Sequence, residues 1–202
     1  MKIRTSLAMG LALCPLVSCN NKPEQSRPNV IYILADDLGY GDLSCMGQQR
    51  FSTPNIDHLA SEGLLMTRHY SGTSVSAPSR SCLITGQHTG HTPIRGNKEW
   101  PVEGQHPFPA SAYNVFEYMS DSGYATGVFG KWGLGAPETE GAPEHQGVTE
   151  FSGYNCQRIA HNYYPEHLWH NGEKVILEGN QGTGEGQYAP YLCHDQALKF
   201  IR

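Results

Sequence analysis

The sequence predicts an α/β fold, with a mixed and largely parallel central sheet flanked by helices, on three observations. Stretches typical of strands alternate with stretches typical of helices along the chain. The first strand-like stretch, residues 29–35, is an almost continuous apolar and β-branched run, as in strands buried on both faces of a parallel sheet. With 202 residues, 38% of them hydrophobic, the chain has the length of one domain and enough apolar material for a core.

Two helices are expected in the first half, because both ends of each carry terminal signals. At residues 53–63, Thr53 is a capping residue, Pro54 stands at the first helical position and a glycine follows the last turn. Residues 76–86 also carry helix-terminal signals, with a proline in the first turn and a glycine after the last turn. Residues 64–70, between the two helices, are predicted to form a strand.

The second half is predicted to contain long loops with fewer regular elements. Residues 87–109 are rich in Gly, His and Pro and are assigned to a loop. Helical spacing returns over 112–122, and a strand is expected over 124–129. Beyond residue 135 the pattern weakens into a long irregular stretch, and only 192–202 again has helical spacing.

The N-terminus is predicted to direct export. Lys2 and Arg4 precede an apolar run, and residues 16–19, Leu-Val-Ser-Cys, resemble the lipobox in which the cysteine becomes the acylated first residue of the mature chain. We therefore expect a lipoprotein-type signal peptide at 1–18 and a membrane anchor through a lipid on Cys19. The expected location is the periplasm or the outer membrane.

The rest of the chain is expected to be a short polar tether, residues 19–28, followed by one domain, residues 29–202. Lys and Arg total 14 against 19 Asp and Glu, which gives a net charge of −5, and no basic run occurs. This balance argues against a nucleic-acid partner. The cysteines of the domain form no Cys-x-x-Cys pair, which argues against a zinc site and favours buried free thiols.

Asp36 and Asp37 are the first candidate site residues. They follow the strand predicted at 29–35, and ligands of open α/β sheets bind at the carboxyl ends of the strands. Two adjacent carboxylates repel each other, so a cation such as Ca²⁺ or Mg²⁺ would stabilise the pair, and both ions prefer oxygen ligands. The alternative is an acidic turn.

Ser76, Arg80 and Lys131 form the second group of candidates. Ser76 is expected at a helix N-terminus, where backbone N–H groups and the helix dipole favour an anion, and Arg80 lies one turn further on. Ser76 could be a nucleophile, with the Arg80 guanidinium binding an oxyanion beside it. The alternative is that Ser76 only caps the helix. Lys131 follows a predicted apolar strand, and its positive charge could stabilise a leaving oxygen. The alternative is a lysine that is simply exposed to solvent.

Three stretches, in this order, resemble the formylglycine-dependent sulfatases of the alkaline phosphatase superfamily. Residues 29–39 resemble the first strand and the Asp-Asp metal pair of that family. Residues 76–86, SAPSRSCLITG, are similar to its signature [CS]-x-P-[SA]-R-x-x-L-x-T-G, and residues 130–132 are similar to its Gly-Lys-Trp block. The resemblance covers most of residues 29–202.

The resemblance implies a mechanism. A maturase that acts on serine-type signatures would oxidise Ser76 to formylglycine. The hydrated aldehyde, held by Arg80 and bound to a Ca²⁺ ion on Asp36 and Asp37, with Mg²⁺ as the alternative ion, would attack the sulfur of a sulfate ester, and Ser76 would thus belong to the metal site too. Lys131 would bind the sulfate or stabilise the departing alkoxide.

The sequence departs from the family pattern in two ways. Many members have a histidine two residues after the lysine, where this chain has Gly133. His161 is a candidate replacement as proton donor, and it forms a candidate substrate-binding group with Gln157 and Arg158. The family's second metal pair and smaller C-terminal subdomain normally lie beyond the position of Arg202. We therefore expect a truncated catalytic domain that is poorly soluble and inactive when expressed alone.

Three functions remain open from the sequence. The leading one is a sulfatase that removes sulfate from an extracellular glycan or another sulfate ester. The second keeps Ser76 unmodified, as the nucleophile of a phosphatase or phosphodiesterase. The third is an inactive fragment or an exported binding protein.

Overall fold

The computed structural model describes residues 27–202. The chain divides into two units, with the boundary between Leu38 and Gly39, and we describe each unit separately. The predicted signal peptide, its Cys19 and most of the predicted tether lie outside the described residues. None of the described helices has the length and apolar character that crossing a membrane requires.

The first unit contains no regular element within its described residues, so the strand predicted over 29–35 is wrong. The stretch is extended, but none of the ladders in the described chain includes it. Its apolar side chains are exposed, to 83% at Ile33. The composition of this stretch is typical of a strand. A strand also needs a hydrogen-bonded neighbour, and a single stretch of sequence does not reveal whether it has one.

The second unit begins with short helices that pack on one another. Two 3₁₀ turns, η1 (Tyr40–Asp42) and η2 (Ser44–Met46), precede helix α1 (Pro54–Glu62), which confirms the helix predicted there. Thr53 is tied to Ser44, and the Asp57 carboxylate accepts the Cys45 N–H at 2.9 Å. The strand predicted over 64–70 is wrong, because these residues are exposed, contain a turn at 67–68 and have no ladder partner.

A four-stranded mixed sheet is the centre of the second unit and confirms the α/β class. Its strands are β1 (Gly127–Lys131), β2 (Glu150–Tyr154), β3 (His167–His170) and β4 (Glu173–Ile176), in that spatial order. Strands β1 and β2 are parallel, and the other two pairings are antiparallel.

The strand positions differ from the sequence prediction for physical reasons. Strand β1 starts three residues later than expected, because Thr126 is engaged before it through hydrogen bonds to Gly147 and Thr149. The stretch beyond residue 135 is not irregular, since three of the four strands lie in it. These strands are short and contain His, Trp, Glu and Gly, so their composition does not reveal them. The Asn171-Gly172 turn between β3 and β4 is the local signal that was overlooked.

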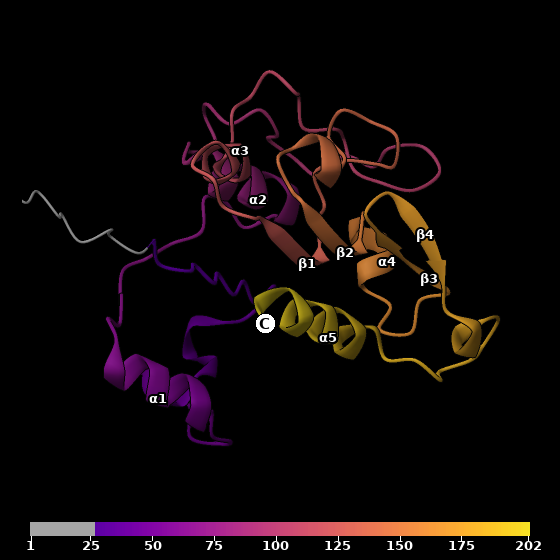
Figure 1. The fold of residues 1–202 in the computed structure, drawn as a ribbon. Helices are drawn as coiled ribbons and strands as arrows, with labels where there is room; N and C mark the ends of the chain where they lie inside the picture. Colours follow the sequence, from indigo (N-terminus) through magenta and orange to yellow (C-terminus); the bar gives the residue numbers. More distant parts are fainter. Residues whose placement is uncertain (1–26) are drawn as a thin grey trace, which may run out of the picture. The chain divides into compact units, whose positions relative to one another are not determined.

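Helices cover both faces of this sheet (Figure 1). Helix α2 (Ser76–Thr85) contacts α3 (Val115–Asp121), and both contribute to an apolar cluster that includes Phe151 of β2. Helix α5 (Ala189–Ile201) packs on β1 and β2 from the other side, through a second cluster around Tyr154. Burial of a side chain such as Phe151 contributes roughly 1.5–3 kcal/mol.

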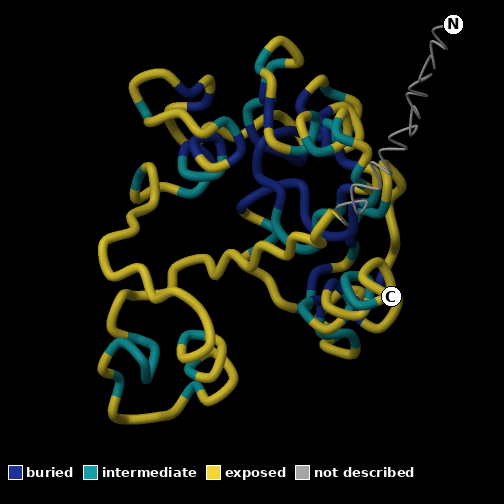
Figure 2. The backbone as a smooth tube through the Cα atoms, turned by 60° about the vertical axis from the view of Figure 1, so that its left-hand side comes forward, coloured by how far each residue is buried: buried dark blue, intermediate teal, exposed yellow. Residues whose placement is uncertain are grey.

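The remaining short elements are η3 (Pro143–His145), α4 (Gln157–Ala160) and η4 (Glu178–Asn180). Buried residues (Figure 2) occur in α2 and β2, and many others lie in the connecting segments, including 103–105, 132–136 and 141–143. None of the described residues before Ala77 is buried. The core of this unit therefore begins at α2, the helix that carries the candidate nucleophile.

Candidate active site

Ser76 is the first residue of α2 and not its cap. Val75 occupies the cap position and is extended, and no side chain at that position caps the helix. The N–H of Ala77 is instead satisfied by the Asn97 side chain, whose Oδ1 accepts it at 2.9 Å. The closing glycine, Gly86, has φ +66°, a left-handed conformation that glycine adopts without strain. The cap that the sequence offered as the alternative role of Ser76 is therefore not observed.

Arg80 joins Ser76 to the end of strand β1. Its Nε donates to Ser76 Oγ at 3.1 Å, which the one-turn spacing of the two residues on α2 permits. Its Nη1 donates to the main-chain oxygen of Lys131 at 2.7 Å. The planar guanidinium thus binds a hydroxyl and a carbonyl at once, and the structure brings together the three residues that the sequence proposed as catalytic.

The residues after Lys131 are fixed by β2 and the segment that follows it. The Trp132 N–H donates to the Tyr154 carbonyl, and its indole Nε1 donates to Gly141 at 2.8 Å. The Trp132 side chain is 3% exposed and belongs to the core. Gly133 follows with φ +73°, and its N–H donates to the Asn155 carbonyl at 3.1 Å.

Gln157 fills the space beside Gly133. Its Nε2 would clash with a Cβ on Gly133, and it donates to the Gly133 carbonyl at 3.4 Å. Gln157 is buried, and its Oε1 has no hydrogen-bond partner among the described residues. A side chain at position 133 would therefore have to displace the Gln157 amide.

The other two members of the predicted substrate-binding group are exposed. Arg158 lies on α4, and its Nη2 donates to the Val102 carbonyl at 3.4 Å. His161 follows the last turn of α4, and its N–H donates to Arg158. The structure therefore places Gln157 in the interior and Arg158 at the surface, on successive residues.

Asp36 and Asp37 belong to the first unit and form a turn there. Asp37 has φ +59°, a left-handed conformation that Asp tolerates better than most residues. Within residues 27–202, no group of three His, Cys, Asp or Glu side chains lies close enough to hold a metal ion. The two carboxylates alone supply the type of oxygen donor that Ca²⁺ and Mg²⁺ prefer.

The loop predicted over 87–109 contains a buried carboxylate that no sequence pattern indicates. Glu103 is 9% exposed, and its Oε1 accepts the Trp169 indole N–H at 2.6 Å. Its Oε2 lies 2.8 Å from His167 Nε2 and 3.9 Å from Lys174 Nζ. Trp169 and Lys174 lie on different strands, so Glu103 fixes the loop to β3 and β4.

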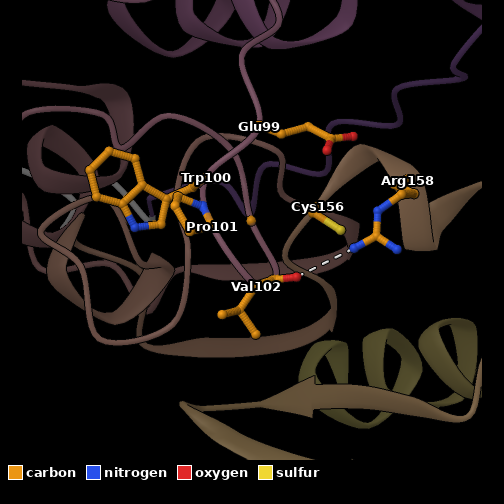
Figure 3. Close-up of a pocket in the computed structure, with 7 residues that line it drawn as sticks. Glu99, Trp100, Pro101, Val102, Cys156 and Arg158 are labelled. Atoms are coloured by element: carbon orange, nitrogen blue, oxygen red, sulfur yellow. Dashed lines mark hydrogen bonds between the residues drawn. The ribbon is translucent and has the colours of Figure 1, made fainter.

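A cavity of about 280 Å³ lies between this loop and the start of α4 (Figure 3). The side chains labelled in the figure line it: Glu99, Trp100, Pro101, Val102, Cys156 and Arg158. Burial raises the pKa of the Cys156 thiol, so this part of the wall is neutral. Loop 87–109 was predicted as a loop, but its part in a cavity was not.

Comparisons with known proteins agree on one family. The family model described as Sulfatase matches residues 28–199. An N-acetylgalactosamine-6-O-sulfatase of Bacteroides thetaiotaomicron is 38% identical over 172 residues, which are 78% of this chain and 30% of the relative. An N-acetylglucosamine-6-O-sulfatase of the same species is 30% identical over 199 residues, which are 98% of this chain and 32% of the relative.

A solved structure shows the same fold. The crystal structure of Ps i-CgsB in complex with k-i-k-neocarrahexaose matches with a TM-score of 0.70 and 28% identity, over 87% of this chain and 41% of that one. The chain spans about a third of the length of the curated relatives it matches.

Proposed function

The chain belongs to the sulfatase family, and from this premise we propose that it hydrolyses sulfate esters of extracellular glycans at a site built on Ser76, Arg80 and Lys131. The observation that carries the proposal is the Arg80 guanidinium, which contacts Ser76 Oγ and the Lys131 carbonyl together. A helix N-terminus and a guanidinium at one place form an environment that stabilises a sulfate group and the charge that develops on it, and the main chain of Lys131 is joined to them.

We propose that Ser76 is converted to formylglycine by a maturase. When formed, this group supplies a hydrated aldehyde oxygen as the nucleophile toward sulfur. The proposal rests on the signature around Ser76 and on its position at the start of α2, where Arg80 holds the side-chain oxygen at a fixed place.

Asp36 and Asp37 are proposed as ligands of a Ca²⁺ ion, or of Mg²⁺, since their adjacent carboxylates have the donor chemistry of such a site. When bound, such a cation supplies positive charge that stabilises anionic oxygens.

The residues of this chain have distinct tasks in the proposed reaction. Arg80 orients the oxygen at position 76, and it is itself oriented by the Lys131 carbonyl. Lys131 binds the sulfate or stabilises the departing alkoxide. Over one turnover the ester S–O bond breaks and one water is consumed, and the products are an alcohol, sulfate and one proton.

The proposed substrate is a sulfated glycan. Two relatives bear the names of 6-O-sulfatases of N-acetylhexosamines, and a similar structure contains a neocarrahexaose. The proposed location is the periplasm or the outer membrane, with a lipid on Cys19 as the anchor. Gln157, Arg158 and His161 are proposed to contribute to substrate binding beside the catalytic group.

The test is the release of inorganic sulfate by protein purified from its native host. With N-acetylhexosamine 6-sulfates as probes, we expect sulfate release that Ser76→Ala abolishes, and no phosphate release from the matching 6-phosphates. Arg50→Gln, at an exposed position of the second unit, is the control variant. Phosphate release that depends on Ser76, without sulfate release, would instead support the phosphatase alternative.

A further inference from the structure

Residues 98–106 form a narrow hairpin-like loop at the cavity of Figure 3. Glu99 and Gln105 are paired by a β-bridge, and the His106 N–H donates to the Lys98 carbonyl at 2.8 Å. The Trp100 N–H donates to the Gly104 carbonyl at 3.3 Å, which closes the tip. The backbone of this loop is therefore defined by its own hydrogen bonds.

The loop is also fixed from outside at three points. At its base, the Gln105 N–H donates to the Gly135 carbonyl at 3.0 Å. Near its tip, the buried Glu103 binds the side chains of β3 and β4, and Arg158 donates to the Val102 carbonyl. These contacts hold a rigid wall on one side of the cavity.

Val102 has a strained backbone in this conformation of the loop. It has φ +72°, a conformation that is strained for a β-branched residue, and it is 96% exposed, so no burial of its side chain compensates. Strained backbone of this kind persists only where the surroundings impose it, and it is concentrated at ligand-binding sites.

Two chain segments connect the cavity wall with residues that contact the proposed catalytic group and Gly133. Asn97 binds the Ala77 N–H next to Ser76, and Glu99 of the cavity wall is only two residues further, a reach of at most about 7 Å. Cys156 of the wall lies between Asn155 and Gln157, both of which contact Gly133. Residues of the cavity wall thus lie within two positions of Asn97 and next to Gln157, the residues that contact Ala77 and Gly133.

We infer that the cavity is a subsite for a sugar unit with a second negative charge, which adjoins the sulfated unit of the glycan. The inference rests on the proposed function, because it assigns the substrate of the same site. In Figure 3 the Trp100 indole lies on one side of the cavity, and Glu99 and Arg158 lie on the other. An aromatic face opposite hydrogen-bonding side chains suits a pyranose ring.

Each wall residue has a task in this subsite. The Trp100 indole stacks on the apolar face of the ring, and the Glu99 carboxylate accepts hydrogen bonds from its hydroxyl groups. Arg158 uses one guanidinium nitrogen for the Val102 carbonyl, and it directs the others to a carboxylate or a second sulfate on the sugar. Arg158 thus stabilises the loop and favours a negatively charged sugar over a neutral one.

The experiment measures binding by calorimetry to the Ser76→Ala protein purified from its native host, a variant that leaves the ligand intact. Three disaccharides of N-acetylhexosamine 6-sulfate are compared, joined to a hexuronate, to a hexose sulfate or to a neutral hexose. We expect the two charged ligands to bind about tenfold more tightly than the neutral one, a difference of about 1.4 kcal/mol. The tighter of the two identifies the charged group.

Variants assign this preference to the cavity. Arg158→Gln should abolish it, Arg158→Lys should retain part of it, and the surface control Arg50→Gln should leave it intact. Trp100→Ala should weaken all three ligands, and Trp100→Phe should weaken them less. Equal affinities for the three ligands, no binding of any, or equal effects of Arg158→Gln and Arg50→Gln would overturn the inference. Because binding is measured without turnover, these results are independent of whether the wild-type protein releases sulfate.

Discussion

At the scale of single residues, Arg80 is the most demanding position of the proposed site. Two hydrogen bonds leave from different nitrogens of its planar group, to Ser76 Oγ and to the Lys131 carbonyl. A lysine has a single donor atom and lacks this fork. We predict that Arg80→Lys lowers kcat/KM for sulfate release by about 100-fold or more, with little change in thermal stability. An activity within threefold of wild type would contradict this role, and Arg50→Lys is the matched control.

Gly133 offers a second test at this scale, because the chain contains a matched glycine. Gly133 and Gly86 have φ of +73° and +66°, but a Cβ on Gly86 would enter open space, whereas a Cβ on Gly133 would meet the Gln157 amide. We predict that both changes to Ala cost about 1 kcal/mol for the backbone conformation, and that Gly133→Ala costs more.

A double-mutant cycle isolates the contact with Gln157. If the amide causes the additional cost, Gly133→Ala should be less destabilising in a Gln157→Ala background, as measured by chemical denaturation. Equal costs at the two glycines, or an additive cycle, would show that the amide moves aside freely.

At the scale of elements, helix α5 brings a thiol into the core beside β1 and β2. Burial raises the pKa of Cys193 to about 11, from an ordinary value near 9, so the folded protein keeps the proton between these values while the unfolded chain loses it. The stability of the fold should therefore fall as pH rises from 9 to 11, by an amount on the order of 2–3 kcal/mol. Burial also raises the pKa of Tyr154, which contributes a loss of the same sign above pH 10.

The measurement is denaturant unfolding at a series of pH values. Cys193→Ala lowers stability at every pH but should flatten part of the fall between pH 9 and 10, because the buried Cys156 thiol, whose pKa is also raised, contributes to the same fall. An unchanged slope in Cys193→Ala would contradict the assignment of this fall to α5.

The elements also differ in how well the sequence predicts them. Helix α2 was found because its proline and closing glycine are local signals, and the end of α5 kept its helical spacing. Strand β2 pairs with residues about 20 positions away in the chain, which its own five residues do not specify. Strands β3 and β4 form a hairpin whose two-residue turn is Asn171-Gly172, a local turn signal that the prediction of an irregular stretch overlooked. The stretch 29–35 had strand composition without a partner in the described chain.

The same distinction holds within the site. Ser76, Arg80 and Lys131 were identified from sequence patterns, and the structure adds the hydrogen bonds that join them. Asn97, Glu103 and Trp100 carried no signal, since each acts through a contact with a distant segment or lies on a loop with a composition typical of any loop.

At the scale of the whole molecule, the described chain divides into a buried core that begins at α2 and a preceding stretch without buried residues. Because the amides of 29–35 enter no ladder, we predict that they exchange with solvent within seconds, whereas the amides of β2 are protected for far longer. Hydrogen exchange followed by mass spectrometry measures both in one experiment. Comparable protection of 29–35 and β2 would show that the stretch is paired, as its composition suggested.

Exposed apolar side chains have a further consequence at this scale. Val30, Ile31 and Ile33 are each more than half exposed, and Leu64 and Tyr70 are exposed to a similar degree. We therefore predict that residues 19–202 expressed alone are poorly soluble and melt broadly. A soluble protein with a sharp, cooperative melt would contradict this prediction.

The most direct test of the account is the mass of the peptide that contains Ser76, in protein from the native host. Trypsin cleaves after Arg68 and Arg80 and releases residues 69–80, which have no internal Lys or Arg. We predict a peptide lighter than the encoded one by two hydrogens and reactive toward a hydrazine probe, as formylglycine requires. An unmodified serine in otherwise mature protein would contradict sulfatase chemistry at this site.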